Sequence, residues 1–320
     1  MQRPAIFASL DPAQRVLIAG AGGGFDVYAG LPLASALRDS GKQVFLANLS
    51  FSELHVLDLG VWAAPNVAAV TPATAGLDDY FPERSLAVWL ASNEAAAELP
   101  TTVYAFPKVG VEPLREAYAA LVELLGIDAI VLIDGGTDIL LRGDEAALGT
   151  PVEDMTSLAA VAGLDGVPVR VVACIGFGID AYHGVNHVQV LENIADLDQD
   201  GAYLGAFSVP SGSREAELYR SAVEHAQATT PSRPSIVNGQ IAAALAGRHG
   251  DVRFTRRTRD SVLFVNPLMA LYFTFDLIGL ARRNLYLDRL EHTIGMNQVA
   301  SRIAAYRAEA PTRTPRAFPH

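Results

Sequence analysis

Three aspartates lie close to a glycine pair in residues 131–145, which read VLIDGGTDILLRGDE. Asp134 and Asp138 follow an apolar run typical of a central strand, and ligands of open α/β sheets bind beyond the carboxyl ends of the strands. Carboxylates gathered in one loop repel each other unless a divalent cation, Arg142 or a cationic substrate relieves them. We therefore predict that Asp134 and Asp138 are catalytic, as base or metal ligand, and that Arg142 binds substrate. The alternative is a loop whose aspartates accept bonds from backbone N–H groups.

Two histidines follow a second strand-like run, in residues 175–197, IGFGIDAYHGVNHVQVLENIADL. If a helix begins near His183, then His183 and His187 lie one turn apart on one face, with Asp180 at the N-terminal edge. Imidazoles at this spacing hold a divalent metal or divide acid and base work. We predict catalytic roles for both histidines, a substrate-binding role for Asp180, and a metal site formed by Asp138, His183 and His187. The alternative is a capped helix whose histidines hydrogen-bond locally.

A glycine loop, GAGGGFDVYAG, follows the first strand-like run. Gly22, Gly23 and Gly24 would cradle an anionic or ribose-like group with their backbone amides, and Asp26 would accept protons from ligand hydroxyls or amines. The dinucleotide fingerprint G-x-G-x-x-G fails, because Phe25 stands where the third glycine should be. The sequence does not identify a cofactor, but it favours a divalent metal over NAD. The alternative is a tight strand-to-helix turn.

Other common kinds of catalytic site find little support in this sequence. Cys174 is the only cysteine and lies inside an apolar run, so a disulfide framework and a Cys-rich zinc cluster are excluded. No G-x-S-x-G elbow surrounds the serines, so Ser-His-Asp hydrolysis is not supported.

The composition favours a small-molecule substrate as the partner. Of the 320 residues, 50% are hydrophobic, enough for a sizeable core, while a net charge of −11 argues against nucleic acid. No basic run suggests a membrane surface, and no signal peptide is recognisable. The most apolar segment, residues 261–281, is interrupted by Asn266, Pro267 and Asp276; we expect a buried strand pair and a helix there, not a membrane span. We expect a cytoplasmic protein.

The order of the predicted elements indicates an α/β fold. Short β-rich runs alternate with amphipathic runs such as residues 111–125, where Leu114, Tyr118 and Leu121 share one face. We predict a doubly wound, mainly parallel, Rossmann-like sheet with helices on both faces and a C-terminal helical segment. One domain would span residues 1–310, with residues 311–320 as a flexible tail. The apolar fraction is compatible with a homo-oligomer.

Finer expectations concern the connections. Residues 278–307 should form one long closing helix, and residues 71–84 and 141–156 should be long loops. The arginine-rich run of residues 256–259 should be a solvated face.

Several of these segments together resemble a known family. The runs LIAGAGGGFDVYAGLPLASAL, LIDGGTDILLRGDE and LGTPVEDM, with the segment of His183 and His187, are similar to the family called domain of unknown function 1152. The resemblance covers most of the chain, with specific motifs between Gly20 and Leu204. It implies that the glycine loop and the acidic loop are family features, and it leaves catalysis and binding open.

Three functions follow from these residues. The first is an enzyme that acts on a polar metabolite, nucleoside-like compounds included, by hydrolytic or lyase-type chemistry with Asp/His acid-base or metal-assisted steps. The second is a nucleotide- or NAD-using enzyme centred on the glycine loop. The third is a non-catalytic module that binds a small ligand.

Overall fold

The computed structural model describes residues 3–77, 79–252 and 264–317, and the strands within these ranges form one sheet of nine. Their order across the sheet is β3-β4-β5-β2-β1-β6-β7-β9-β8. The strands are β1 (Arg15–Gly20), β2 (Gln43–Leu49), β3 (Trp62–Ala64), β4 (Val67–Val70), β5 (Val103–Phe106), β6 (Ala129–Asp134), β7 (Val169–Cys174), β8 (Tyr203–Ser208) and β9 (Leu271–Asp276). The predicted arginine-rich run at residues 256–259 lies outside the described residues.

The centre of the sheet is parallel and its edges are antiparallel. Strands β5, β2, β1, β6 and β7 pair in parallel, whereas β3 and β4 at one edge and β9 and β8 at the other pair antiparallel. From β1 the chain moves outward to β2 and β5, then returns to add β6 and β7 on the other side of β1. The direction of winding therefore reverses between β1 and β6. The predicted α/β class with a mainly parallel central sheet is confirmed.

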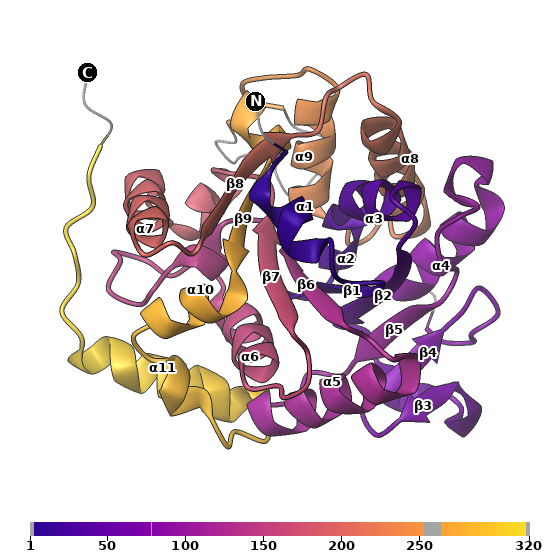
Figure 1. Ribbon diagram of the computed structural model, residues 1–320, viewed down its shortest axis with the longest axis horizontal. Coiled ribbons are helices and arrows are strands. Elements are labelled where there is room, and N and C mark those ends of the chain that lie inside the picture. The colour runs from indigo at the N-terminus through magenta and orange to yellow at the C-terminus, as the bar shows by residue number, and fades with distance from the viewer. Residues whose placement is uncertain (1–2, 78, 253–263, 318–320) are drawn as a thin grey trace.

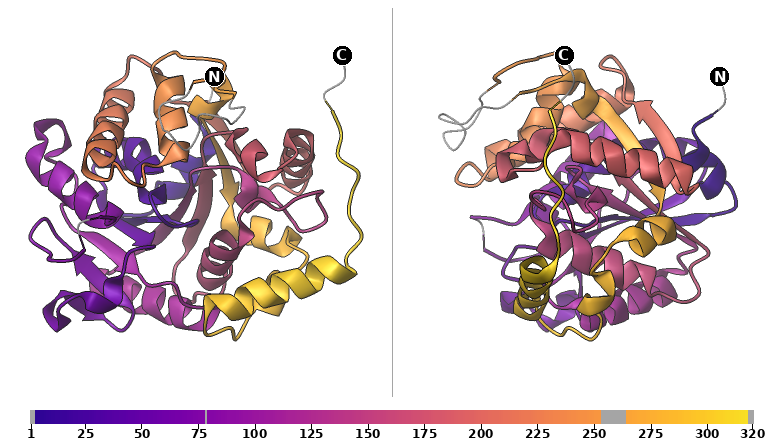
Figure 2. Two further views of the ribbon diagram at one scale, coloured as in Figure 1. Left: turned by 180° about the vertical axis from the view of Figure 1, so that it is seen from behind. Right: turned by 90° about the vertical axis from the view of Figure 1, so that its left-hand side faces the viewer.

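Helices cover both faces of this sheet, as Figures 1 and 2 show. One face packs against α1 (Ala5–Leu10), α2 (Asp26–Ala29), α3 (Leu31–Asp39), α4 (Pro82–Ser92), α8 (Arg214–Thr229) and α9 (Ile236–Leu245). The other packs against α5 (Val111–Leu125), α6 (Pro151–Ala162), α7 (His187–Gln199), α10 (Leu277–Arg283) and α11 (Met296–Glu309).

The sequence builds two cores because side chains alternate across a strand. On β1, Leu17 and Ala19 lie in one buried cluster, and Val16 and Ile18 lie in the other. Every residue of β6 is buried, which explains its unbroken apolar run. These two strands form the rigid platform from which the site residues project.

The C-terminal segment is helical but not a single helix, so the prediction for residues 278–307 is wrong. Helix α10 ends before Asn284, whose Oδ1 accepts the backbone N–H of Tyr286 at 3.0 Å and turns the chain. A short 3-10 helix, Leu287–Leu290, follows, and α11 starts afresh after Gly295.

The two predicted long loops are shorter than expected. Helix α4 begins at Pro82 and α6 at Pro151, each inside a segment that we assigned to a loop. Proline is favoured in the first turn of a helix, because its missing N–H has no intrahelical partner there.

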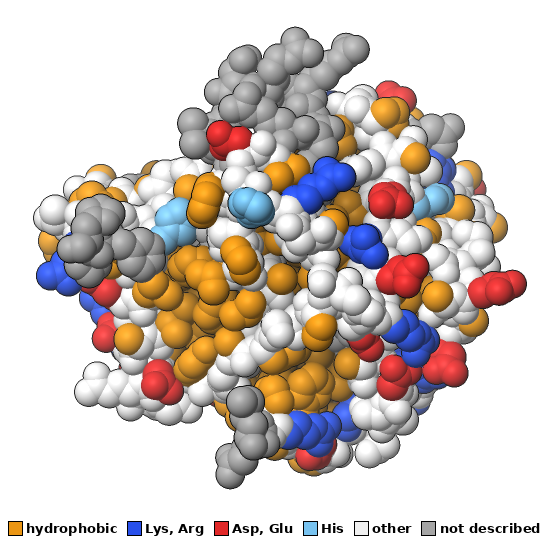
Figure 3. All heavy atoms as spheres, turned by 90° about the horizontal axis from the view of Figure 1, so that it is seen from above, with side chains coloured by type: hydrophobic (Ala, Val, Ile, Leu, Met, Phe, Trp, Pro, Cys, Tyr) orange, Lys and Arg blue, Asp and Glu red, His pale blue; other side chains and the backbone are white. Residues whose placement is uncertain are grey.

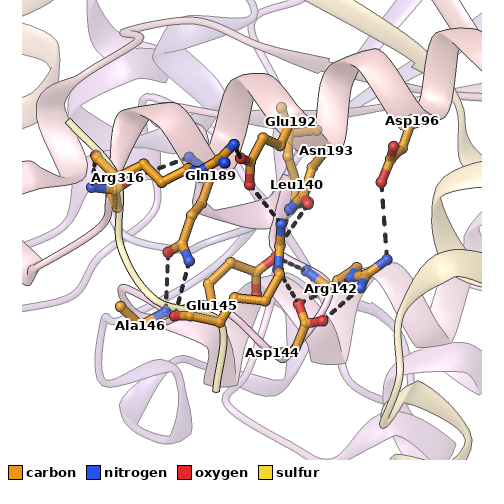
Figure 4. A network of polar contacts seen from close by, with 12 residues as sticks. Leu140, Arg142, Asp144, Glu145, Ala146, Gln189, Glu192, Asn193, Asp196 and Arg316 are labelled. Carbon is orange, nitrogen blue, oxygen red and sulfur yellow. Dashed lines mark hydrogen bonds and ion pairs between the residues drawn. The ribbon is translucent and has the colours of Figure 1, made fainter. Parts of the chain in front are cut away.

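The C-terminal tail is extended along α7 and hydrogen-bonds with it, as far as residue 317. The Arg313 guanidinium contacts Glu145 at 2.9 Å, Asp144 at 2.8 Å and Glu192 at 2.9 Å. Glu145 is fully buried, so Arg313 compensates a charge that lacks access to water. Figure 4 shows Glu192 and Asn193 pointing from α7 toward the loop that carries Asp144 and Glu145.

The outer surface is mixed in character. Seen from above, one face carries scattered charged side chains, and hydrophobic side chains gather in two areas (Figure 3).

Among the described residues, no helix is both long and apolar enough to cross a membrane. The described part of the apolar segment at residues 261–281 contains β9 and α10, with a 3-10 helix, Pro267–Ala270, before them; residues 261–263 lie outside the description.

Candidate functional site

A pocket of about 620 Å³ opens beyond the carboxyl ends of β1 and β6. Five aspartates from four separate segments of the chain line it. They are Asp26, Asp134, Asp138, Asp154 and Asp180. The glycine loop, the start of α6 and the 3-10 helix Ile179–His183 therefore meet the end of β6 at the point where the winding reverses.

The glycine loop positions Asp26 at the start of α2. Asp26 Oδ2 accepts the backbone N–H of Gly22 at 2.7 Å. Gly23 and Gly24 have φ values of +88° and +63°, which side chains other than glycine rarely adopt. The loop is held by Asn48 at the end of β2, whose Nδ2 donates to the Gly24 carbonyl at 2.8 Å. The predicted site residues Gly22, Gly23, Gly24 and Asp26 all line the pocket.

The acidic loop after β6 delivers two carboxylates to the same pocket. Asp134 is the last residue of β6 and is 4% exposed, and its one described hydrogen bond comes from the Ile139 N–H at 3.4 Å. Asp138 Oδ2 accepts two bonds from Thr150, at 2.7 Å from the backbone N–H and 3.0 Å from the hydroxyl. Asp138 thus fulfils the predicted capping alternative and also lines the pocket.

Asp180 comes from the segment after β7 and contacts the acidic loop directly. Its Oδ2 accepts the Thr137 backbone N–H at 2.7 Å and faces the Thr137 hydroxyl at 3.3 Å. The chain can approach this closely because Gly136 has no side chain: a Cβ there would lie 2.7 Å from Asp180 Oδ1. The loops after β6 and β7 are therefore joined through one carboxylate.

Asp154 completes the group, and sequence reasoning missed it as a site residue. It lies in the first turn of α6, is 1% exposed, and its Oδ1 has no hydrogen-bond partner among the described residues. The Ser157 hydroxyl donates to the Ala21 carbonyl at 2.8 Å and fixes α6 against the glycine loop. One signal was available: Asp154 shares a helix face with the apolar Leu158 and Val161.

The two histidines do not act as a pair. His183 lines the pocket, but the predicted helix from His183 is wrong. The 3-10 helix Ile179–His183 stops at Gly184, where φ is +81°, and α7 begins independently with Asn186 as its N-cap. His183 and His187 therefore belong to two separate helical elements and do not share one helix face.

His187 lies outside the acidic pocket. Its Nε2 is 3.0 Å from the Gly178 carbonyl, and its ring centroid is 5.6 Å from that of Phe177. It lines a separate, smaller cavity with Gln240 and Asn266. The predicted metal set of Asp138, His183 and His187 is consequently not brought together by the fold.

Arg142 also lies away from the pocket. Its guanidinium hydrogen-bonds both carboxylate oxygens of Asp144, at 3.0 and 2.5 Å, and lies 3.9 Å from Asp196 of α7. Figure 4 shows it beneath α7, within the ion-pair network that the tail completes. The short 3-10 turn Asp138–Leu140 carries the chain away from the pocket before Arg142 is reached.

Loss of hydration raises the pKa of every aspartate in the pocket. Burial is the largest cause for each residue, and neighbouring carboxylates add to it for Asp26, Asp134, Asp154 and Asp180. The pKa of Asp26 rises to about 7, and the pKa values of Asp134, Asp154 and Asp180 rise well above the ordinary value. The rise for Asp138 is opposed by the Thr150 bonds and by His183.

No salt bridge within the described residues involves these five aspartates. Carboxylate oxygens of Asp26, Asp134 and Asp154 lie within 4.8 Å of one another, close enough to hold a metal ion together. Carboxylates packed this closely repel each other unless they keep protons or share a cation.

Four exposed or partly exposed residues also line the pocket, and we call them its mouth, in contrast to the aspartates of its floor. They are Phe51, Tyr80, Lys108 and Arg233. The Lys108 ammonium lies 4.5 Å from the centroid of the Phe51 ring, and the Arg233 guanidinium lies 5.9 Å from that of Tyr80. These residues come from distant segments and form no recognisable motif, so they could not be grouped from the sequence.

Comparison with known proteins gives one match. Residues 17–308 match the model of a family described as protein of unknown function, DUF1152. Neither the curated proteins nor the solved structures include a significant match.

Proposed function

The chain belongs to the DUF1152 family, and from this premise we propose that it is an enzyme of small-molecule metabolism. The proposed reaction is hydrolytic or lyase-type, on a polar, nucleoside-like metabolite, with the pocket aspartates in acid-base roles. The family description names no activity, so the proposal depends on the geometry of the pocket.

One observation carries the proposal: five aspartates from four segments, four of them buried and Asp26 half-buried, converge in a single cavity. Burying a carboxylate away from water costs several kcal/mol unless something compensates its charge. Such groups cluster where a site needs perturbed pKa values. Helix capping alone would not require all five to line one cavity of about 620 Å³, which is an ordinary size for a small-molecule site.

The sheet topology supports the same location. In doubly wound sheets, ligands bind in the crevice beyond the strand ends, at the point where the strand order reverses. Here the reversal lies between β1 and β6, and Asp26 and Asp134 follow or end those two strands. This agreement favours the Rossmann-like plan predicted from the sequence.

The aspartates differ enough to divide the proton transfers. Asp138 receives two bonds from Thr150, and the nearby His183 lowers its pKa, so it is the candidate base. Burial and the neighbouring carboxylates raise the pKa of Asp180 well above the ordinary value, so it is the candidate acid. His183, at the pocket, would relay protons between Asp138 and solvent.

Covalent catalysis by the cysteine is not favoured. Cys174 is fully buried in β7, and burial raises the pKa of its thiol well above the ordinary value. Direct attack by water, or proton abstraction from the substrate, is therefore the preferred type of step.

The lining also supports the substrate class. The rings of Phe51 and Tyr80 at the mouth are suited to contact a flat heterocycle, and the carboxylates of the floor accept bonds from sugar-like hydroxyls. Lys108 and Arg233 at the mouth would contact an acidic substituent of the metabolite.

A nucleotide- or NAD-using enzyme is the second candidate, because the glycine loop lines the same pocket. Two features disfavour it: the Gly22 N–H already donates to Asp26, and the five acids of the floor repel phosphate groups. A non-catalytic binding module would use the same cavity without converting its ligand.

A ligand screen followed by a turnover assay separates these functions. The protein is screened by thermal shift with nucleosides, sugars, amino acids, NAD, ATP and AMP, and each stabilising compound is then incubated and followed by mass spectrometry. We expect a nucleoside-like compound to be converted, and Asp138→Asn to slow conversion by roughly 100-fold or more. Asp165→Asn, an exposed control, should leave the rate unchanged.

Three results would contradict the proposal. Stabilisation by NAD, ATP or AMP alone would favour the second candidate. Stabilisation without conversion of any compound would favour a binding module. Conversion that survives both Asp138→Asn and Asp180→Asn would remove the aspartates from the reaction.

A further inference from the structure

Three of the pocket aspartates lie close enough together to share one ion. Carboxylate oxygens of Asp26, Asp134 and Asp154 lie within 4.8 Å of one another. Oxygens bound to a Mg²⁺ or Ca²⁺ ion at about 2.1–2.4 Å can be at most roughly 4–5 Å apart, when they lie on opposite sides of the ion. The spacing of the three carboxylates thus suits a shared cation with little movement.

Two of these three residues, Asp134 and Asp154, have few other partners among the described residues. Asp154 is 1% exposed, and its Oδ1 accepts no hydrogen bond among the described residues. Asp134 is 4% exposed, and within the described part of the chain its one hydrogen bond comes from the Ile139 N–H at 3.4 Å, a long contact. A buried acceptor without a partner is costly, and native proteins rarely leave one without a role. A bound cation would satisfy both residues.

Gly22 makes room for two of the three carboxylates. A Cβ at Gly22 would lie 2.6 Å from Asp154 Oδ1 and 2.7 Å from Asp26 Oδ2, closer than any real side chain tolerates. The absence of a side chain there lets α6 and the glycine loop bring Asp154 and Asp26 together over the backbone of the loop. This glycine requirement concerns close approach, since the φ of Gly22 is not among the positive values.

We propose that Asp26, Asp134 and Asp154 bind one divalent cation, Mg²⁺ or Mn²⁺, at the floor of the pocket. The ligand set contains only carboxylate oxygens, which suit these hard cations better than zinc or copper. It replaces the set of Asp138, His183 and His187 expected from the sequence, and leaves Asp138 and His183 for proton transfer. The proposal deepens the proposed function and rests on it for the role of the ion, which would orient a substrate hydroxyl or a water.

Direct binding of Mn²⁺ tests the site without a known substrate. The full chain is stripped with EDTA, dialysed to pH 8 and titrated with MnCl₂, while the free Mn²⁺ signal is followed by electron paramagnetic resonance. We expect one Mn²⁺ per chain, displaced by excess Mg²⁺, and an affinity at least tenfold lower in Asp154→Asn. The matched control is Glu153→Gln, one residue away on α6, which should keep the affinity within about threefold.

A second variant distinguishes the loss of a metal ligand from a folding defect. Circular dichroism and the urea midpoint report whether Asp154→Asn is folded; Asp134→Asn, in which the asparagine can still accept the Ile139 N–H, should show the same loss of Mn²⁺ affinity. Failure of the wild-type chain to bind Mn²⁺ at millimolar concentration would overturn the proposal, as would unchanged affinity in a folded Asp154→Asn or Asp134→Asn chain.

The two proposals fail separately. If Mn²⁺ does not bind but a metabolite is converted in the presence of EDTA, the cation site is wrong and the enzymatic function stands. If Mn²⁺ binds at these residues but no compound is converted, the function is wrong and the cation site stands.

Discussion

Replacing Asp26 by asparagine should stabilise the ligand-free protein, and the gain should grow with pH. Burial, partly opposed by the Gly22 N–H, raises the pKa of Asp26 from 3.8 to about 7. Between these values the folded state binds more protons at this residue than the unfolded state does. The free energy of unfolding therefore falls as pH rises through this window, and it levels off above the folded pKa. Asparagine does not ionise, so the free energy of unfolding of the variant does not fall with pH for this reason.

The size of the effect follows from the two pKa values. Each tenfold change in proton affinity corresponds to about 1.4 kcal/mol. The rise from 3.8 to about 7 therefore lowers the free energy of unfolding by on the order of 4 kcal/mol above pH 8, and less than half of this decrease has already occurred at pH 5. The stabilisation by Asp26→Asn should thus be roughly 3 kcal/mol larger at pH 8.5 than at pH 5.

Urea unfolding in EDTA at both pH values measures this difference. The comparison between two pH values cancels contributions that do not titrate, such as packing of the new amide. Glu123→Gln, at an exposed position of α5, provides the control and should show no such growth. If Asp26→Asn and wild type differ by the same amount at pH 5 and at pH 8.5, the reasoning about the buried carboxylates is refuted.

Three further predictions concern the tail, the acidic loop and the ion. Arg313→Gln should lower the free energy of unfolding by about 2 kcal/mol, because Glu145 is fully buried, whereas Arg316→Gln, whose ion pair is exposed, should cost less than about 1 kcal/mol; urea unfolding of both variants measures the contrast. Gly136→Ala should push Asp180 away from its position, since the new Cβ would lie 2.7 Å from its Oδ1, and conversion of a substrate should fall at least tenfold in a chain that remains folded by circular dichroism. Millimolar Mg²⁺ should raise the melting temperature of the EDTA-treated protein more at pH 8 than at pH 5.5, because protons occupy the carboxylates at the lower pH; equal shifts at both pH values would count against carboxylate ligation.

Much of the fold was predictable because its signals are local. The apolar runs of β1 and β6 and the helical spacing of α5 specify buried strands and a helix without knowledge of the rest of the chain. Parallel strands place their carboxyl ends at one edge, so the convergence of Asp26, Asp134 and Asp180 also followed from sequence. The expected cytoplasmic location and homo-oligomer stay predictions.

The remaining part of the site depended on contacts between distant segments. Asp154 enters through the packing of Ser157 against the backbone of Ala21, 136 residues away. The histidine pair failed for a local reason: the left-handed Gly184 and the cap at Asn186 restart the helix. Both residues are weak predictors of a helix boundary, because glycine and asparagine occur in many turns.

Arg142 illustrates the same limit. A basic residue beside a group of acids was a reasonable substrate ligand, but the structure pairs it with Asp144, which the tail residue Arg313 also contacts. Asp144 lies only two residues from Arg142, so that pair was open to sequence reasoning, whereas the contact of Asp144 with Arg313, 169 residues away along the chain, was not. The charged residues of this ion-pair network are visible in the sequence, but the sequence does not indicate which of them pair with each other.

The most direct test of a working site at these carboxylates is a crystal structure of the full chain grown or soaked with MnCl₂ at pH 8, with anomalous diffraction data. It should show one anomalous peak within about 2.0–2.6 Å of oxygens from Asp26, Asp134 and Asp154. Anomalous peaks confined to exposed surface acids, with the three carboxylates bonded to one another or to water alone, would contradict it.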